Sequence, residues 1–124
     1  MAAKILIIDD EKDMRTYLGT LFRKEGFEIE SASNGEEGIA LAKSFQPDLI
    51  TLDVMMPKKS GLKAYTELRT STETKDIPII VLTGLTKQED FFGENLGELP
   101  RPNALVEKPI DRDKFIEVAK QVMG

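Results

Sequence analysis

The sequence has 124 residues, which fits one compact domain, and its 40% hydrophobic and 31% charged residues are ordinary for a soluble globular protein. Cysteine and histidine are absent, which excludes disulfides, thiolate metal sites and phosphohistidine chemistry within the chain. The net charge of −5 disfavours nucleic-acid binding, because a phosphate backbone attracts basic surfaces.

The N-terminus carries only a short apolar run, at residues 5–8. A secretory signal needs roughly 7–15 apolar residues, and a membrane-spanning helix needs about 20. We therefore expect a soluble, cytoplasmic protein that does not enter a membrane. With no linker or internal repeat in the sequence, we also expect residues 1–124 to form a single domain.

Four short apolar runs have the length and composition of buried parallel strands. They lie at residues 5–8, 49–52, 79–82 and 104–106. Residues 27–32 alternate between apolar and polar side chains instead, which predicts a fifth strand at a sheet edge with one wet face.

Segments with helical periodicity separate these strands. Apolar residues recur at three- and four-residue spacing within 14–22, 39–45, 62–68, 92–99 and 115–122. Ser33 and Thr86 each stand three residues before a Glu, as in a capping box, and Asp111 can cap the last helix. Strands that alternate with helices imply a parallel sheet covered on both faces, with any site outside the carboxyl ends of the strands.

Four of the five predicted strands end in a polar group that can do chemistry. Asp9 and Asp10 follow the first strand, Asp53 the third, Thr83 the fourth and Lys108 the fifth. Each alone has an ordinary structural interpretation: a helix cap, a strand threonine or a solvated lysine. Their joint appearance at the same end of successive strands favours a functional site.

This set of side chains suits phosphoryl transfer. Clustered carboxylates bind a hard divalent cation, and Mg²⁺ suits a site with few of them because it keeps several waters. An aspartate can also attack phosphorus, which yields an aspartyl phosphate. Mg²⁺ and Lys108 would then neutralise the phosphoryl charge, and Thr83 would donate a hydrogen bond to one phosphoryl oxygen.

These residues occur in the order typical of the receiver domain of two-component response regulators, which the chain resembles over essentially its whole length. The shared motifs are Asp9-Asp10, the Asp-Val-Met-Met-Pro of 53–57, Ser60-Gly61, Thr83-Gly84 and Lys108-Pro109. The resemblance implies an α/β, flavodoxin-like (βα)5 three-layer sandwich whose five-stranded parallel sheet has the order 2-1-3-4-5.

The resemblance also implies a role for each site residue. Asp53 would be the phosphoacceptor, and Thr83 and Lys108 would hold the phosphoryl oxygens. The implied ligands of Mg²⁺ are Asp10, Asp53, the backbone carbonyl of Met55 and, through water, Asp9.

The implied partners are two proteins. The phosphoryl donor would be a phosphohistidine on a sensor histidine kinase or a histidine phosphotransfer protein, which must be another chain because this one has no histidine. The downstream protein would bind the face formed by the fourth helix, the fifth strand and the fifth helix. The domain would be a self-phosphorylating and self-dephosphorylating switch, not a turnover enzyme, either alone or as part of a longer protein.

The sequence departs from the family pattern in three places. Leu105 stands where the family usually has Tyr or Phe, so the usual coupling between the threonine and that aromatic is altered. Residues 97–102 contain two prolines, which predict an irregular connection and a partner-specific output instead of the common receiver dimer. Met55 and Leu85 are apolar where many receivers place the attacking water with polar residues, which predicts slow loss of the phosphoryl group.

Three other functions remain as alternatives. A phosphatase of the haloacid-dehalogenase type needs an Asp-x-Asp motif after the first strand, whereas Asp9 and Asp10 are adjacent. A flavodoxin needs a phosphate-cradling loop there, and the acidic run from Asp9 to Glu11 would repel phosphate. A pseudo-receiver that binds partners without phosphorylation conflicts with the intact acidic and lysine set, but Leu105 keeps it open.

Overall fold

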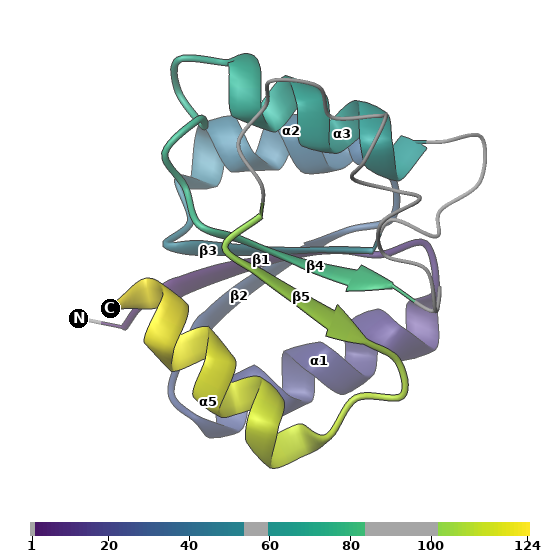
Figure 1. The fold of residues 1–124 in the computed structure, drawn as a ribbon, viewed down its shortest axis with the longest axis vertical. Helices are drawn as coiled ribbons and strands as arrows, with labels where there is room; N and C mark the ends of the chain where they lie inside the picture. Colours follow the sequence, from purple (N-terminus) through teal and green to yellow (C-terminus); the bar gives the residue numbers. More distant parts are fainter. Residues whose placement is uncertain (1, 54–59, 84–101) are drawn as a thin grey trace.

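The computed structural model describes residues 2–53, 60–83 and 102–124 of the chain. Five strands form one parallel sheet in the order β2-β1-β3-β4-β5, which confirms the expected flavodoxin-like strand order (Figure 1). The strands are β1 (Lys4–Ile8), β2 (Glu28–Ala32), β3 (Leu49–Asp53), β4 (Ile79–Thr83) and β5 (Ala104–Glu107).

Four described helices cover the two faces of this sheet. They are α1 (Lys12–Lys24), α2 (Gly35–Phe45), α3 (Ser60–Thr70) and α5 (Arg112–Met123). Helices α2 and α3 lie on one face, and α1 and α5 lie on the other (Figure 1). The helix expected within 86–99, its cap at Thr86 and most of the irregular connection at 97–102 lie outside the described residues. No helix in the described ranges has the length and apolar character needed to cross a membrane.

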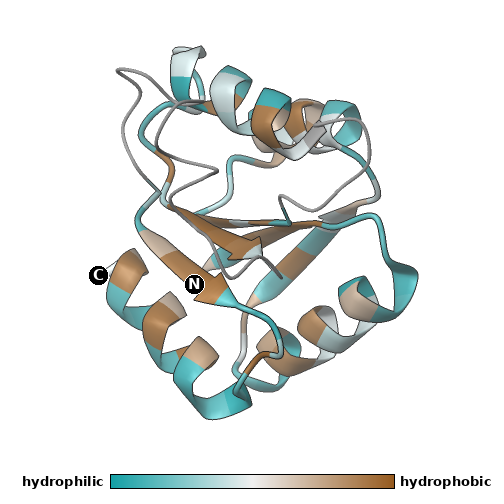
Figure 2. Cartoon of the chain, turned by 45° about the vertical axis from the view of Figure 1, so that its right-hand side comes forward, coloured by the Kyte–Doolittle hydropathy of each residue, from teal (hydrophilic) through white to brown (hydrophobic). Residues whose placement is uncertain are grey.

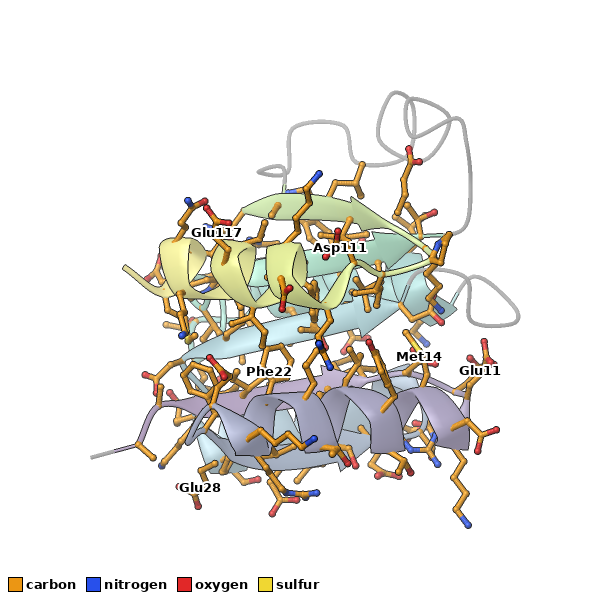
Figure 3. All side chains as sticks on the ribbon, turned by 90° about the horizontal axis from the view of Figure 1, so that it is seen from below. Glu11, Met14, Phe22, Glu28, Asp111 and Glu117 are labelled. Atoms are coloured by element: carbon orange, nitrogen blue, oxygen red, sulfur yellow. The ribbon has the colours of Figure 1, made fainter. Side chains whose placement is uncertain are left out.

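The side-chain alternation of the strands divides the core into two layers. Leu6 of β1 packs toward α2 and α3, while its neighbour Ile7 packs toward α1 and α5. Figure 2 shows much of the sheet in the brown of apolar residues, and Figure 3 labels Phe22 of α1. Phe22 packs against Phe115 of α5, with the ring centroids 5.5 Å apart. Both faces of the central strands are therefore buried, which explains their continuous apolar runs.

The two edge strands are less buried than the central ones. In β2, Ala32 is buried while Glu28 and Glu30 are exposed, which confirms the predicted edge strand with one wet face. The run at 104–106 was expected to form a buried strand like the central ones; β5 instead forms the other edge of the sheet, and its apolar residues are only partly buried.

The N-cap of helix α2 lies one residue later in the chain than predicted. Asn34, not Ser33, is the N-cap residue, and its amide oxygen accepts the backbone N–H of Glu37 at 2.8 Å. The predicted capping box at Ser33 was therefore wrong, because the asparagine one position further along accepts the N–H of Glu37, so the helix begins at Gly35. The predicted cap of α5 is confirmed, since the Asp111 carboxylate accepts a backbone N–H of that helix at 3.3 Å.

Candidate functional site

Parallel strands bring the predicted site residues to one edge of the sheet. Asp9 follows β1, Asp53 and Thr83 are the last residues of β3 and β4, and Lys108 follows β5. Because β1, β3, β4 and β5 are consecutive neighbours in the sheet, their carboxyl ends form one row. The strand order changes direction between β1 and β3, and this topological switch point is where ligands bind in open α/β sheets.

Four carboxylates gather at this edge. Asp9, Asp10, Glu11 and Asp53 each place one oxygen so that all four oxygens lie within 4.8 Å of one another. Asp9 and Asp53 are 0% and 1% exposed, whereas Asp10 and Glu11 are exposed. The cluster thus has a buried floor of two acids and a solvent-facing rim of two more, of which Glu11 was not among the predicted site residues.

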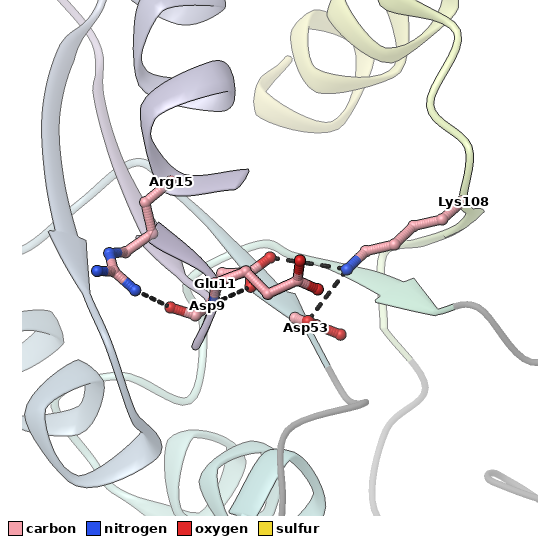
Figure 4. Close-up of polar contacts among 5 residues, drawn as sticks. All are labelled: Asp9, Glu11, Arg15, Asp53 and Lys108. Carbon is pink, nitrogen blue, oxygen red and sulfur yellow. Dashed lines mark hydrogen bonds and ion pairs between the residues drawn. The ribbon is translucent and has the colours of Figure 1, made fainter. Parts of the chain in front are cut away.

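Lys108 is the cation at the floor of this cluster. Its Nζ donates a hydrogen bond to Oδ2 of Asp53 at 3.1 Å and lies 3.8 Å from Oδ2 of Asp9 (Figure 4). Burial lowers the pKa of Lys108, but the hydrogen bond to Asp53 and the negative charges of Asp53, Asp9 and Glu11 outweigh burial and raise this pKa above its usual value. Lys108 is therefore a fully protonated partner of the buried acids.

Of the two buried acids, Asp9 is the one with a carboxylate oxygen that accepts no hydrogen bond among the described residues. Its Oδ1 accepts the backbone N–H of Glu11 at 2.9 Å, while its buried Oδ2 has no hydrogen-bond partner among the described residues. Burial is the main cause that raises the pKa of Asp9 to about 6, and the charge of Asp53 adds to it against the hydrogen bond from Glu11. A buried carboxylate in this state is stabilised by a cation.

The backbone of Asp9 is held from two sides. Its N–H donates to the carbonyl of Ala32 at 3.1 Å, and its own carbonyl accepts a hydrogen bond from Nη1 of Arg15 at 2.8 Å (Figure 4). Sequence reasoning missed both Arg15 and Glu11. The available signal was their closeness in the sequence to the Asp9-Asp10 pair, at the start of the helix that follows it.

The remaining predicted residues have different outcomes. Thr83 is buried at the end of β4, and its backbone carbonyl accepts the backbone N–H of Lys108 at 2.9 Å. Leu105 pairs in register with Val81 and packs, partly buried, against the core on the α2–α3 side. Met55, the predicted carbonyl ligand, lies outside the described residues, as does Leu85.

The donor set fits a hard divalent cation. Mg²⁺ and Ca²⁺ prefer carboxylate and carbonyl oxygens, and this edge offers four carboxylates within a few ångströms. The Oδ2 of Asp9 belongs to the same cluster and accepts no hydrogen bond among the described residues, and its one ion pair there, with Lys108, is long at 3.8 Å. The acidic residues of the site therefore fit the Mg²⁺ that the sequence predicted.

A flavodoxin-like α/β sandwich with acids and a lysine at its strand ends is the arrangement that the sequence motifs predicted for a receiver domain. The family model of the response regulator receiver domain matches residues 5–120. The chain belongs to this family, which confirms the resemblance inferred from its motifs.

Individual proteins agree with this assignment. Protein PilH of Pseudomonas aeruginosa is 30% identical, and the match covers 98% of each chain. The regulatory protein AtoC of Escherichia coli is 40% identical over 97% of this chain, which spans only 25% of AtoC. Among solved structures, the chemotaxis response regulator CheY4 of Vibrio cholerae has a TM-score of 0.86 and 26% identity, with 98% of this chain and 99% of CheY4 covered.

Proposed function

We propose that the chain is a phosphorylation-controlled switch in which Asp53 accepts a phosphoryl group from a phosphohistidine, in a reaction that depends on Mg²⁺. The observation that carries this proposal is the contact of 3.1 Å between Lys108 Nζ and Asp53 Oδ2 within the four-carboxylate cluster. Asp53 is 1% exposed, so its carboxylate is held in one place instead of rotating in solvent. Phosphoryl transfer is favoured by a nucleophile that is held in a fixed position beside a cation.

Four groups of this chain would hold the metal. We assign direct ligation to Asp10, Asp53 and the backbone carbonyl of Met55, and an indirect role through water to Asp9. The bound ion would neutralise negative charge on the phosphoryl oxygens.

The transfer itself is a substitution at phosphorus. One carboxylate oxygen of Asp53 bonds to the phosphorus while the bond from phosphorus to the donor's imidazole nitrogen breaks, and the electron pair of that bond stays on the imidazole. The ammonium of Lys108, which pairs with Asp53 beforehand, then donates to a phosphoryl oxygen. The hydroxyl of Thr83, at the end of the neighbouring strand, donates to another.

The phosphoryl group on Asp53 would connect the two protein partners of the domain. A sensor histidine kinase or a histidine phosphotransfer protein supplies the phosphoryl group. The equilibrium between the inactive and active conformations then shifts by as much as the phosphoryl group stabilises the active conformation more than the inactive one. We assign the output to the face that includes β5 and α5, where a downstream protein binds. Residues 1–124 act as one receiver domain of the cytoplasm, without turnover of a substrate.

Intact mass spectrometry tests the proposal directly. The protein is incubated with an acyl phosphate in the presence of Mg²⁺, beside an Asp53→Asn variant and a sample with chelator. The expected result is one phosphoryl group on the parent protein alone, and only with Mg²⁺. If the protein binds Mg²⁺ but neither an acyl phosphate nor any of a panel of histidine kinases phosphorylates it, the result would instead support a pseudo-receiver.

A further inference from the structure

Glu11 occupies the N-cap position of α1 but does not cap it. Its backbone has the extended conformation of a cap residue, with φ −92° and ψ 120°, and its side chain makes no capping hydrogen bond. The other two helices with described caps use Asn34 and Asp111, whose side-chain oxygens accept a helix N–H at 2.8 and 3.3 Å. Glutamate is a poor cap residue compared with Asn, Asp or Ser, so helix stability does not account for Glu11.

The side chain of Glu11 joins the acidic cluster instead. One of its carboxylate oxygens lies within 4.8 Å of oxygens of Asp9, Asp10 and Asp53. Figure 4 shows the side chain of Glu11 together with those of Asp9, Asp53 and Lys108 at the ends of the strands. An exposed glutamate has many rotamers that point into water, and like charges repel, so this placement is unfavourable for the four acids alone.

A buried acid of the same cluster independently indicates a cation. Asp9 is 0% exposed, and its Oδ2 has no hydrogen-bond partner among the described residues. Among the described residues, the carboxylate of Asp9 forms an ion pair only with Lys108, whose Nζ is 3.8 Å away and donates its hydrogen bond to Asp53. One ammonium therefore faces four carboxylates, and a divalent ion would balance the excess negative charge.

We propose that Glu11 is a further positioning residue of the Mg²⁺ site, an inference that rests on the proposed function. Glu11 lies on the exposed rim of the cluster, and Mg²⁺ keeps several of its waters when it binds to protein. Glu11 accepts hydrogen bonds from these waters, orients them and adds attraction for the ion. Loss of an outer group of this kind typically costs about 10–100-fold in metal affinity.

Calorimetric titration of the metal-free protein with Mg²⁺ tests this role. The variants are Glu11→Gln, which removes the charge at nearly constant size, and Glu11→Asp, which restores it. Asp13→Asn is the matched control, because Asp13 is an exposed acid in the first turn of the same helix but lies outside the cluster. We expect Glu11→Gln to raise the Kd for Mg²⁺ about tenfold, Glu11→Asp to recover most of the affinity, and Asp13→Asn to change it less than about twofold.

Thermal unfolding in chelator separates a metal role from a structural one. Glu11→Gln is expected to unfold at or above the temperature of the parent protein, because it loses repulsion and no cap. Unchanged Mg²⁺ affinity in Glu11→Gln, or an equal loss in Asp13→Asn, would overturn the inference about Glu11. Absence of Mg²⁺ binding by the parent protein would instead overturn the proposed function.

Discussion

The ammonium of Lys108 lies 3.1 Å from the carboxylate of Asp53, although the two residues are 55 positions apart in the chain. Asp53 ends β3 and Lys108 follows β5, so the contact passes the end of the intervening strand β4. The carboxylate is 1% exposed and the lysine side chain 22%, which makes this a largely buried ion pair.

Removal of Lys108 is expected to destabilise the metal-free protein. Lys108→Met leaves the buried charge of Asp53 without its hydrogen-bonded cation, and we expect a loss of about 2 kcal/mol in the free energy of unfolding. Excess Mg²⁺ should reduce this loss, because the ion supplies the missing positive charge. Urea unfolding in chelator and in Mg²⁺ measures both effects.

Lys120→Met is the control for this experiment. Its ion pair with Glu25 is short, at 2.8 Å, but both side chains are substantially exposed. We expect a loss below about 1 kcal/mol that Mg²⁺ does not change. Equal losses in the two lysine variants would contradict the special role of the Lys108 pair.

The raised pKa of Asp9 predicts how stability depends on pH. The pKa rises from 3.8 to about 6 in the folded protein, so between these values the folded state binds more protons than the unfolded state. Stability from this group is therefore highest at acidic pH and falls as the pH rises through about 6. A shift of about two units corresponds to at most about 3 kcal/mol.

Asp9→Asn isolates this contribution from that of the other acids. In chelator, we expect the variant to be more stable than the parent protein near neutral pH, and this advantage to shrink toward pH 4 (the ordinary range of an aspartate). Urea unfolding at several pH values gives the difference directly. A difference that is independent of pH would show that Asp9 is not the group that titrates.

Arg15 is expected to support the metal site without contact to the ion. Its guanidinium holds the carbonyl of Asp9 at 2.8 Å, and its loss frees the turn that carries the first acids. We expect Arg15→Met to raise the Kd for Mg²⁺ about tenfold, at the lower end of what loss of an outer positioning group does. Titration followed by NMR measures this, with Arg23→Met, at the exposed end of the same helix, as the control.

Two helical glycines should respond to alanine in opposite directions. A Cβ at Gly38 of α2 would lie 2.5 Å from Cδ1 of Ile8, whereas the nearest atom at Gly19 of α1 is 3.5 Å away, on the flexible side chain of Arg23. Gly38→Ala should destabilise the fold by about 1–3 kcal/mol through overpacking. Gly19→Ala should stabilise it by about 0.5–1 kcal/mol through helix propensity. Chemical unfolding of both variants checks the pair, and stabilisation by Gly38→Ala would show that α2 can move away from β1.

Most of the element order could be predicted from the sequence because its signals are local. The alternating run at 27–32 predicted an edge strand, and β2 has that position and a wet face. Strand order came from the family resemblance, since periodicity does not say which strands are neighbours. The cap of α2 was placed at Ser33 instead of Asn34, because two adjacent residues both had the chemistry of a cap and only the backbone distinguishes them.

The candidate site divides in the same way. The sequence alone determined that Asp9, Asp53 and Lys108 follow predicted strands, and parallel strands align such positions at one edge. Their roles in phosphoryl transfer stay predictions. Only the tertiary structure decided that Glu11 turns into the cluster, that Arg15 holds the backbone of Asp9, and which acids are buried. Side-chain direction and burial depend on packing between segments far apart in the chain, and a one-dimensional pattern does not contain those distances.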